Sequence, residues 1–141
     1  MDLTLAAELD EVNTNFAAAI KGLEAALRKD APDLPDLGKR RSQLARLAGQ
    51  RLRFLTGRLV PVLDAGPTAA HVAAARALEE RLRALFGEST RHIGDWSSAR
   101  ISSDWPGYVA ATRGMIARVE AFLAAERREV YPLLGTVRRA A

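Results

Sequence analysis

The sequence contains no cysteine and only two histidines among its 141 residues. The absence of cysteine excludes disulfide bonds, thiol catalysis and cysteine-ligated metal sites. Charged residues interrupt every apolar stretch within a few positions, so we expect no membrane-spanning segment. The N-terminus has no basic stretch followed by an apolar run, which is the pattern of a signal peptide. We therefore expect a soluble cytoplasmic protein.

Valine, isoleucine and threonine are scarce, whereas alanine, leucine, arginine and glutamate are abundant. This composition favours helix over sheet. A length of 141 residues with a hydrophobic fraction of 48% suits one domain, residues 1–141, with a core of its own. No stretch shows the alternation of a β-strand, so we predict an all-α fold.

Four stretches repeat apolar residues at three- and four-residue steps, which is typical of amphipathic helices. They cover residues 9–27, 37–59, 72–96 and 108–130. Because the connections between them are short, neighbouring helices are expected to run antiparallel. The sequence therefore predicts an up-down-up-down four-helix bundle.

Polar residues and prolines mark the expected helix ends. Asp36, Thr68 and Asp104 stand where each can cap the helix that follows it. Pro61 is expected to disturb the last turn of the second helix. The polar segment 97–104 is expected to break or loosen the chain between the third and fourth helices.

Two of the predicted helix ends have nearly the same sequence. Residues 51–63 and 122–134 both end in the same five-residue pattern. Its order is an aliphatic residue, valine or tyrosine, proline, a second aliphatic residue and leucine. The two segments are 71 residues apart, which is about half of the chain. This repeat indicates two helical hairpins stacked into one bundle.

The phrase Glu126-x-x-x-Val130-Tyr-Pro-Leu-Leu134, with the four-helix pattern, resembles the hemerythrin-like (HHE cation-binding) family. In that family the second and fourth helices each carry a His-x-x-x-Glu/Asp pair before a Tyr/Phe-Pro-aliphatic-Leu close, and the pairs bind two iron ions inside the bundle. The segments around His92 and Asp104 are similar to the third-to-fourth helix region of some bacterial members. The resemblance covers nearly the whole chain and implies a hemerythrin-like four-helix bundle.

Most positions that the resemblance assigns to metal ligands carry side chains that do not bind iron. Arg51 occupies the histidine position of the second helix, and Leu55 occupies its carboxylate position. In the fourth helix Phe122 replaces the histidine, while Glu126 matches the carboxylate. In the first helix Phe16 takes the inward position. We therefore expect no di-iron centre and no other cofactor.

The two histidines cannot restore such a centre. His71 and His92 both lie in the third predicted helix, 21 residues apart. At a rise of about 1.5 Å per residue, that spacing separates them by roughly 30 Å. We expect His71 to be exposed and His92 to be a half-buried, hydrogen-bonded side chain.

Arg51 and Glu126 approach one another inside the bundle if the two helix ends superpose as the repeat suggests. Our hypothesis is that their ion pair replaces the metal as the cross-link between the second and fourth helices. The alternative, which the uncertain rotation of the helices favours, is that Arg51 extends outward along its aliphatic stem and Glu126 is solvated.

Two surfaces are candidates for binding a partner. The net charge is +4, and the segment that contains Lys39, Arg40 and Arg46 has no acidic neighbour, which suits an acidic partner. Trp96 and Trp105 are the aromatic candidates. They are expected to pack the loop against the end of the bundle, or alternatively to line a pocket or a partner surface.

The leading functional prediction is a non-enzymatic regulatory or signalling module that binds an unidentified protein or assembles with copies of itself. The alternative is a residual metal- or oxygen-binding redox sensor that uses Glu126 with His92 or other carboxylates. Nucleic-acid binding through the basic second helix is a third hypothesis.

Overall fold

The computed structural model describes the backbone of residues 2–140 and the side chains of residues 5–135. Most of the chain lies in the long helices α1 (Asp2–Leu27), α2 (Leu34–Phe54), α4 (Ala69–Asp95) and α6 (Trp105–Glu129). The short elements η1 (Leu55–Leu59), α3 (Val60–Asp64), α5 (Ser98–Ser103) and α7 (Tyr131–Ala140) join or extend them. Because no described residue lies in a strand, the all-α prediction is confirmed.

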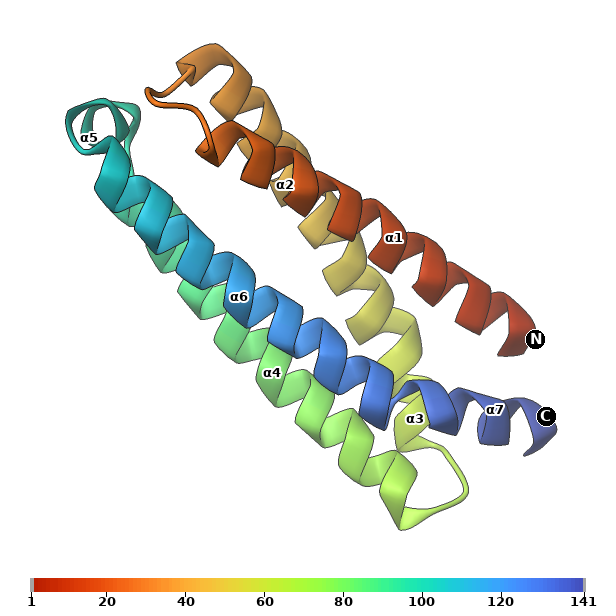
Figure 1. Cartoon of the computed structure of the whole chain (residues 1–141). Helices are drawn as coiled ribbons and strands as arrows, with labels where there is room; N and C mark the ends of the chain where they lie inside the picture. The colour runs from red at the N-terminus through yellow and green to blue at the C-terminus, as the bar shows by residue number, and fades with distance from the viewer. Residues whose placement is uncertain (1, 141) are drawn as a thin grey trace.

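The long helices form two antiparallel pairs, α1 with α2 and α4 with α6, which lie side by side (Figure 1). The two described ends of the chain lie at the same end of the molecule, and the α1–α2 turn and α5 lie at the other. Helices α2 and α6 consequently run in the same direction. Across residues 2–140, no helix combines the length and the apolar character that crossing a membrane requires.

The buried apolar side chains form two clusters, one toward each end of the molecule. The first includes Leu9, Leu55, Leu63, Leu78, Phe122 and Val130. The second includes Phe16, Leu37, Trp96, Tyr108, Ile116 and Val119. The members come from both helix pairs, so burial of apolar surface holds the pairs together.

The two proline-containing segments, residues 51–63 and 122–134, both interrupt a regular α-helix. Pro61 has no backbone N–H and its ring crowds the preceding turn of an α-helix. The chain widens into the π-helical turn η1 just before it, where the Val60 N–H donates to the Leu55 carbonyl oxygen. In the second phrase α6 ends at Glu129, and α7 continues at an angle with Pro132 in its first turn (Figure 1). The predicted disturbance at Pro61 is thus confirmed.

Helix α2 begins earlier than the sequence suggested. Asp33, and not Asp36, caps it, because the Asp33 carboxylate accepts a hydrogen bond from the Asp36 N–H at 3.2 Å. Pro35 favours this start, since proline fits the first turn of a helix. The expected break between the third and fourth helices is confirmed, since α4 ends at Asp95 and α6 begins at Trp105, but the segment between them is the short helix α5, which Ser97 caps.

His71 is buried, with 1% of its surface exposed, although the sequence predicted an exposed side chain. The turn between α3 and α4 closes over its ring at Gly66, where an added Cβ would come within 2.5 Å of the ring. Only glycine fits such a close approach. His71 Nδ1 lies 2.7 Å from the hydroxyl oxygen of Thr68, the residue that caps α4.

Replacement of Thr68 by alanine is expected to destabilise the protein. The change removes the cap of α4 and the hydrogen-bond partner of His71, and should lower the free energy of unfolding by about 1 kcal/mol. Thr68→Ser keeps the hydroxyl and is expected to stay close to the wild type. Urea denaturation monitored by circular dichroism measures both, and equal stability of the two variants would contradict the assignment.

Candidate functional site

A buried ion pair between Arg51 of α2 and Glu126 of α6 joins the two helix pairs. Arg51 Nη2 donates to Glu126 Oε2, and the two residues are only 3% and 0% exposed. The superposition of the two helix ends therefore placed these residues correctly. The alternative, an outward-pointing Arg51 with a solvated Glu126, is wrong.

Asn13 of α1 completes the pair on its other side. Its side-chain Nδ2 donates to Glu126 Oε1 at 2.7 Å, and its Oδ1 accepts from Arg51 Nε at 2.9 Å. Both carboxylate oxygens of Glu126 thus accept a hydrogen bond. The sequence analysis missed Asn13, although its position one turn before Phe16 on the same helix face could have indicated it.

Tyr131 extends this network to the protein surface. Its hydroxyl accepts from Asn13 Nδ2 at 3.1 Å and donates to the exposed carboxylate of Asp10 at 2.9 Å. Partial burial raises the pKa of the Tyr131 hydroxyl, while the hydrogen bond from Asn13 acts in the opposite direction. Because Tyr131 is the first residue of α7, the network connects α1, α2, α6 and α7.

Two aromatic rings enclose the Arg51 guanidinium. Its central carbon lies 5.7 Å from the centre of the Phe16 ring and 5.1 Å from that of Phe122, within the range of cation–π attraction. Burial lowers the pKa of Arg51, although the charge of Glu126 opposes this effect. Arginine nevertheless keeps its charge in proteins, so the site is a neutral pair of opposite charges.

The side chains at this site do not fit the di-iron centre that the resemblance implies. Arg51 is a cation, and Leu55 and Phe122 have no atom that could coordinate iron. Among residues 5–135 Glu126 is the one buried carboxylate, and Arg51 and Asn13 already bind both of its oxygens. Among the residues that the structure describes, no three histidine, cysteine, aspartate or glutamate side chains are grouped as metal ligands would be.

The two histidines lie in different environments near opposite ends of α4. His71 is close to its first residue, whereas His92 near its last turn is half-buried. His92 Nε2 lies 3.1 Å from the Thr112 hydroxyl oxygen, as expected for a hydrogen-bonded histidine. Burial lowers the pKa of His92, and the nearby positive charge of Arg41 lowers it further.

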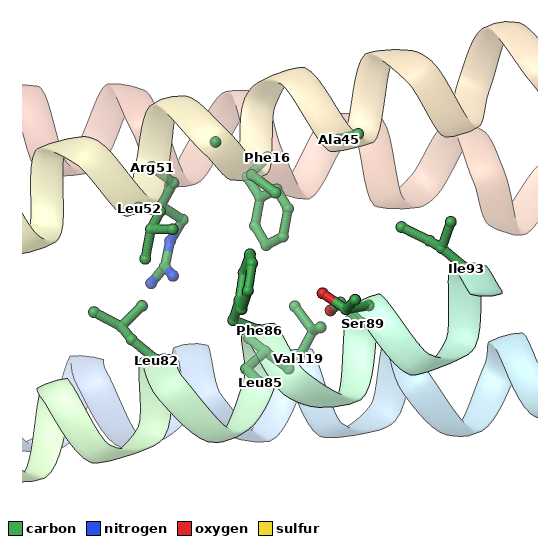
Figure 2. Close-up of a pocket in the computed structure, with 13 residues that line it drawn as sticks. Phe16, Ala45, Arg51, Leu52, Leu82, Leu85, Phe86, Ser89, Ile93 and Val119 are labelled. Atoms are coloured by element: carbon green, nitrogen blue, oxygen red, sulfur yellow. The ribbon is translucent and has the colours of Figure 1, made fainter.

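A cavity of about 230 Å³ lies beside Arg51, between α2 and α4. Figure 2 shows the Arg51 guanidinium reaching into this space and the Phe86 side chain extending from α4 toward Phe16. Phe86 and Ile93 are 61% and 56% exposed, although their spacing predicted a place on the apolar face of the third helix. They are exposed because α2 and α4 do not pack against each other at this point.

A second cavity of about 140 Å³ continues along the same helices toward the α5 end. Its wall includes Arg41, His92, Tyr108, Met115 and Ile116. Both cavities share walls formed by Phe16, Ala48, Ser89 and Val119. The two cavities are therefore adjacent, and residues of all four long helices line them; we refer to both together as the space between α2 and α4.

The two tryptophans that were candidates for the partner surface are not exposed. Trp96 and Trp105 are buried, with 6% and 8% exposed. Their rings pack against Tyr108 at 5.5 Å and 5.8 Å between centres, and Trp105 Nε1 donates to the carbonyl oxygen of Lys29 at 2.9 Å. They hold the α5 end of the molecule together, which is the structural role that the sequence analysis offered first.

The basic part of that surface is exposed at Lys39 and Arg46. Arg40 is half-buried, and its Nε donates to the carboxylate of Asp36 at 3.0 Å. Arg53 is a further exposed cation on the same helix.

No protein-family model matches this chain, and no curated protein or solved structure matches it either.

Removal of one member of the buried pair is expected to be costly. Arg51→Met leaves the Glu126 charge buried without its partner and should lower the free energy of unfolding by about 3–5 kcal/mol. The double variant Arg51→Met/Glu126→Leu removes both charges and should recover most of this loss. Chemical denaturation measures the three proteins.

Arg58→Met is the matched control, because it breaks the exposed ion pair of Arg58 with Glu8 by the same substitution. We expect a loss below about 1 kcal/mol there. An equal loss in Arg51→Met and Arg58→Met would contradict the structural importance of the buried pair.

Proposed function

We propose that this chain is a non-enzymatic, hemerythrin-like four-helix bundle of up-down-up-down topology that acts as a regulatory or protein-interaction module. In this proposal the Arg51–Glu126 pair takes the place of a di-iron centre. The observation that supports it most directly is the hydrogen bonding of Glu126. Asn13 and Arg51 each donate to one of its two carboxylate oxygens, and Glu126 is the one buried carboxylate among residues 5–135.

The exposed side of α2 supports interaction with an acidic protein. Lys39, Arg46 and Arg53 follow one another at seven-residue steps, which places them in a nearly straight line along the helix. We call these three residues the α2 basic face. None of them forms an ion pair with a described side chain, since the salt bridges of residues 5–135 involve other cations. A row of unpaired positive charges attracts an acidic surface and fixes its orientation.

The basic face suits a protein better than a nucleic acid. Seven helical residues correspond to a rise of about 10 Å, so the three cations are widely spaced. Tight binding to a phosphate backbone usually involves more cations, each releasing about one counterion. An affinity for DNA or RNA that falls steeply with salt concentration would favour the nucleic-acid reading instead.

The metal part of the proposal is tested by elemental analysis and visible absorption of the purified protein. We expect iron far below one atom per chain and no absorption band of an oxo-bridged iron pair, because the interior offers a single carboxylate. Stoichiometric iron would overturn the proposal and favour an oxygen- or redox-sensing protein.

The interaction part is tested by charge reversal on the α2 basic face. Lys39→Glu/Arg46→Glu should abolish capture of an acidic protein partner from the native cell extract. Arg113→Glu/Arg127→Glu makes the same change in net charge at exposed positions of α6 and should leave capture intact. Loss of the partner in both variants, or in neither, would contradict the assignment. Sedimentation of the purified protein distinguishes this partner from a second copy of the chain.

A further inference from the structure

The space between α2 and α4 is apolar and deep. Its two parts have volumes of about 230 and 140 Å³, and they reach from the outer rim of α4 to Ile116 and Val119 of α6. Engineered apolar cavities of about 150 Å³ bind molecules the size of benzene. These properties favour a site for an apolar ligand.

The shape of the space suits an extended chain. Its walls run along α2 from Arg41 to Leu52, which corresponds to roughly 15 Å of helix. Small side chains at Ala45, Ala48 and Ser89 leave room across this length.

The space also has an entrance. Phe86 and Ile93 stand at its rim on α4 and are 61% and 56% exposed (Figure 2). The opposite rim on α2 is formed by Ala45 and Gly49. A slender ligand can therefore enter between the two helices without separation of the helix pairs.

The electrostatics of the walls select the sign of the ligand's charge. Neither part of the space has an aspartate or glutamate in its described wall. Arg51 at one end is already neutralised by Glu126. Arg41 at the other end forms no ion pair with the described side chains. The unbalanced charge of the space is therefore positive and lies at Arg41.

Arg41 is held in place but keeps donors for a ligand. Its Nη2 donates to the Trp96 carbonyl oxygen at 3.2 Å, and its guanidinium lies 5.9 Å from the centre of the Tyr108 ring. The His92 ring stacks on the same tyrosine, at 5.8 Å between ring centres. A guanidinium has five N–H donors and binds a carboxylate through two of them.

We propose that this space binds a medium-chain fatty acid, with the carboxylate at Arg41 and the hydrocarbon chain extended between α2 and α4 toward Arg51. This activity is separate from the proposed interaction of the α2 basic face, so either can fail without the other.

Calorimetric titration with decanoate, below its micelle concentration, tests the site. We expect saturable binding of one decanoate per chain, at least tenfold weaker binding of decanol and decylammonium, and none of acetate. Magnetisation transfer between the decanoate methylenes and the methyl groups of Val119 and Ile93 should locate the chain. No saturable binding, or equal affinity for decanoate and decylammonium, would overturn the proposal.

Two pairs of variants separate the contributions of charge and space. Arg41→Gln should weaken decanoate binding at least tenfold and leave decanol binding unchanged, whereas Arg113→Gln, at an exposed cation of α6 outside the space, should affect neither. Unchanged decanoate binding in Arg41→Gln would contradict the carboxylate position.

Ala48→Leu places a larger side chain in the wall that both parts of the space share, and so fills part of the space. We expect it to abolish decanoate binding and to raise the melting temperature of the ligand-free protein, whereas Ala73→Leu, on the exposed side of α4, should bind decanoate normally. A lower melting temperature in Ala48→Leu with decanoate binding retained would show that the ligand lies elsewhere.

Flotation with anionic phospholipid vesicles should leave the wild type unbound, because the space admits one chain. Stable flotation would point to a lipid surface and overturn the proposal.

Discussion

The ion pair between Arg51 and Glu126 is the interaction on which the rest of the structure depends. Two opposite charges buried between helices must stay in contact, since separating them leaves each charge in the interior without solvent or an opposite charge. The pair therefore fixes the register of α2 against α6, which belong to different helical hairpins. Asn13 and Tyr131 extend this constraint to α1 and α7 through hydrogen bonds to the same group of atoms. The apolar clusters on either side add stability, but their packing alone would tolerate small shifts between helices.

The same pair accounts for the space between α2 and α4. Because Arg51 must face Glu126, the rotation of α2 about its own axis is fixed. That rotation turns Ala45, Ala48 and Gly49 toward α4, and these short side chains cannot fill the distance between the two helices. The polar centre and the apolar cavity are thus two consequences of one constraint.

The sequence predicted the helices and suggested the Arg51–Glu126 pair as a hypothesis, although it favoured a solvated Glu126, and it did not indicate the surroundings of the pair. Arg51 and Glu126 could be found because the repeated phrase aligns two helices that run in the same direction. Asn13 was missed because a single polar residue on an amphipathic helix is usually solvated. The burial of His71 depends on a turn that closes over it at Gly66, which periodicity along one helix does not report. Contacts between elements that are distant in the chain set both environments.

The repeated phrase has a structural meaning that goes beyond the likeness of the two helix ends. Its positions place Arg51 level with Phe122, so Glu126 lies one helical turn further along, about 6 Å away. Arg51 nevertheless reaches Glu126, and its guanidinium lies near the rings of Phe16 and Phe122. Each charged residue also lies four positions before a change in its helix, the π-turn that begins at Leu55 and the break at Val130. The bends that follow bring α3 and α7 over this end of the core. The proline phrase can therefore preserve the geometry of a central cross-link when the cross-link is a salt bridge.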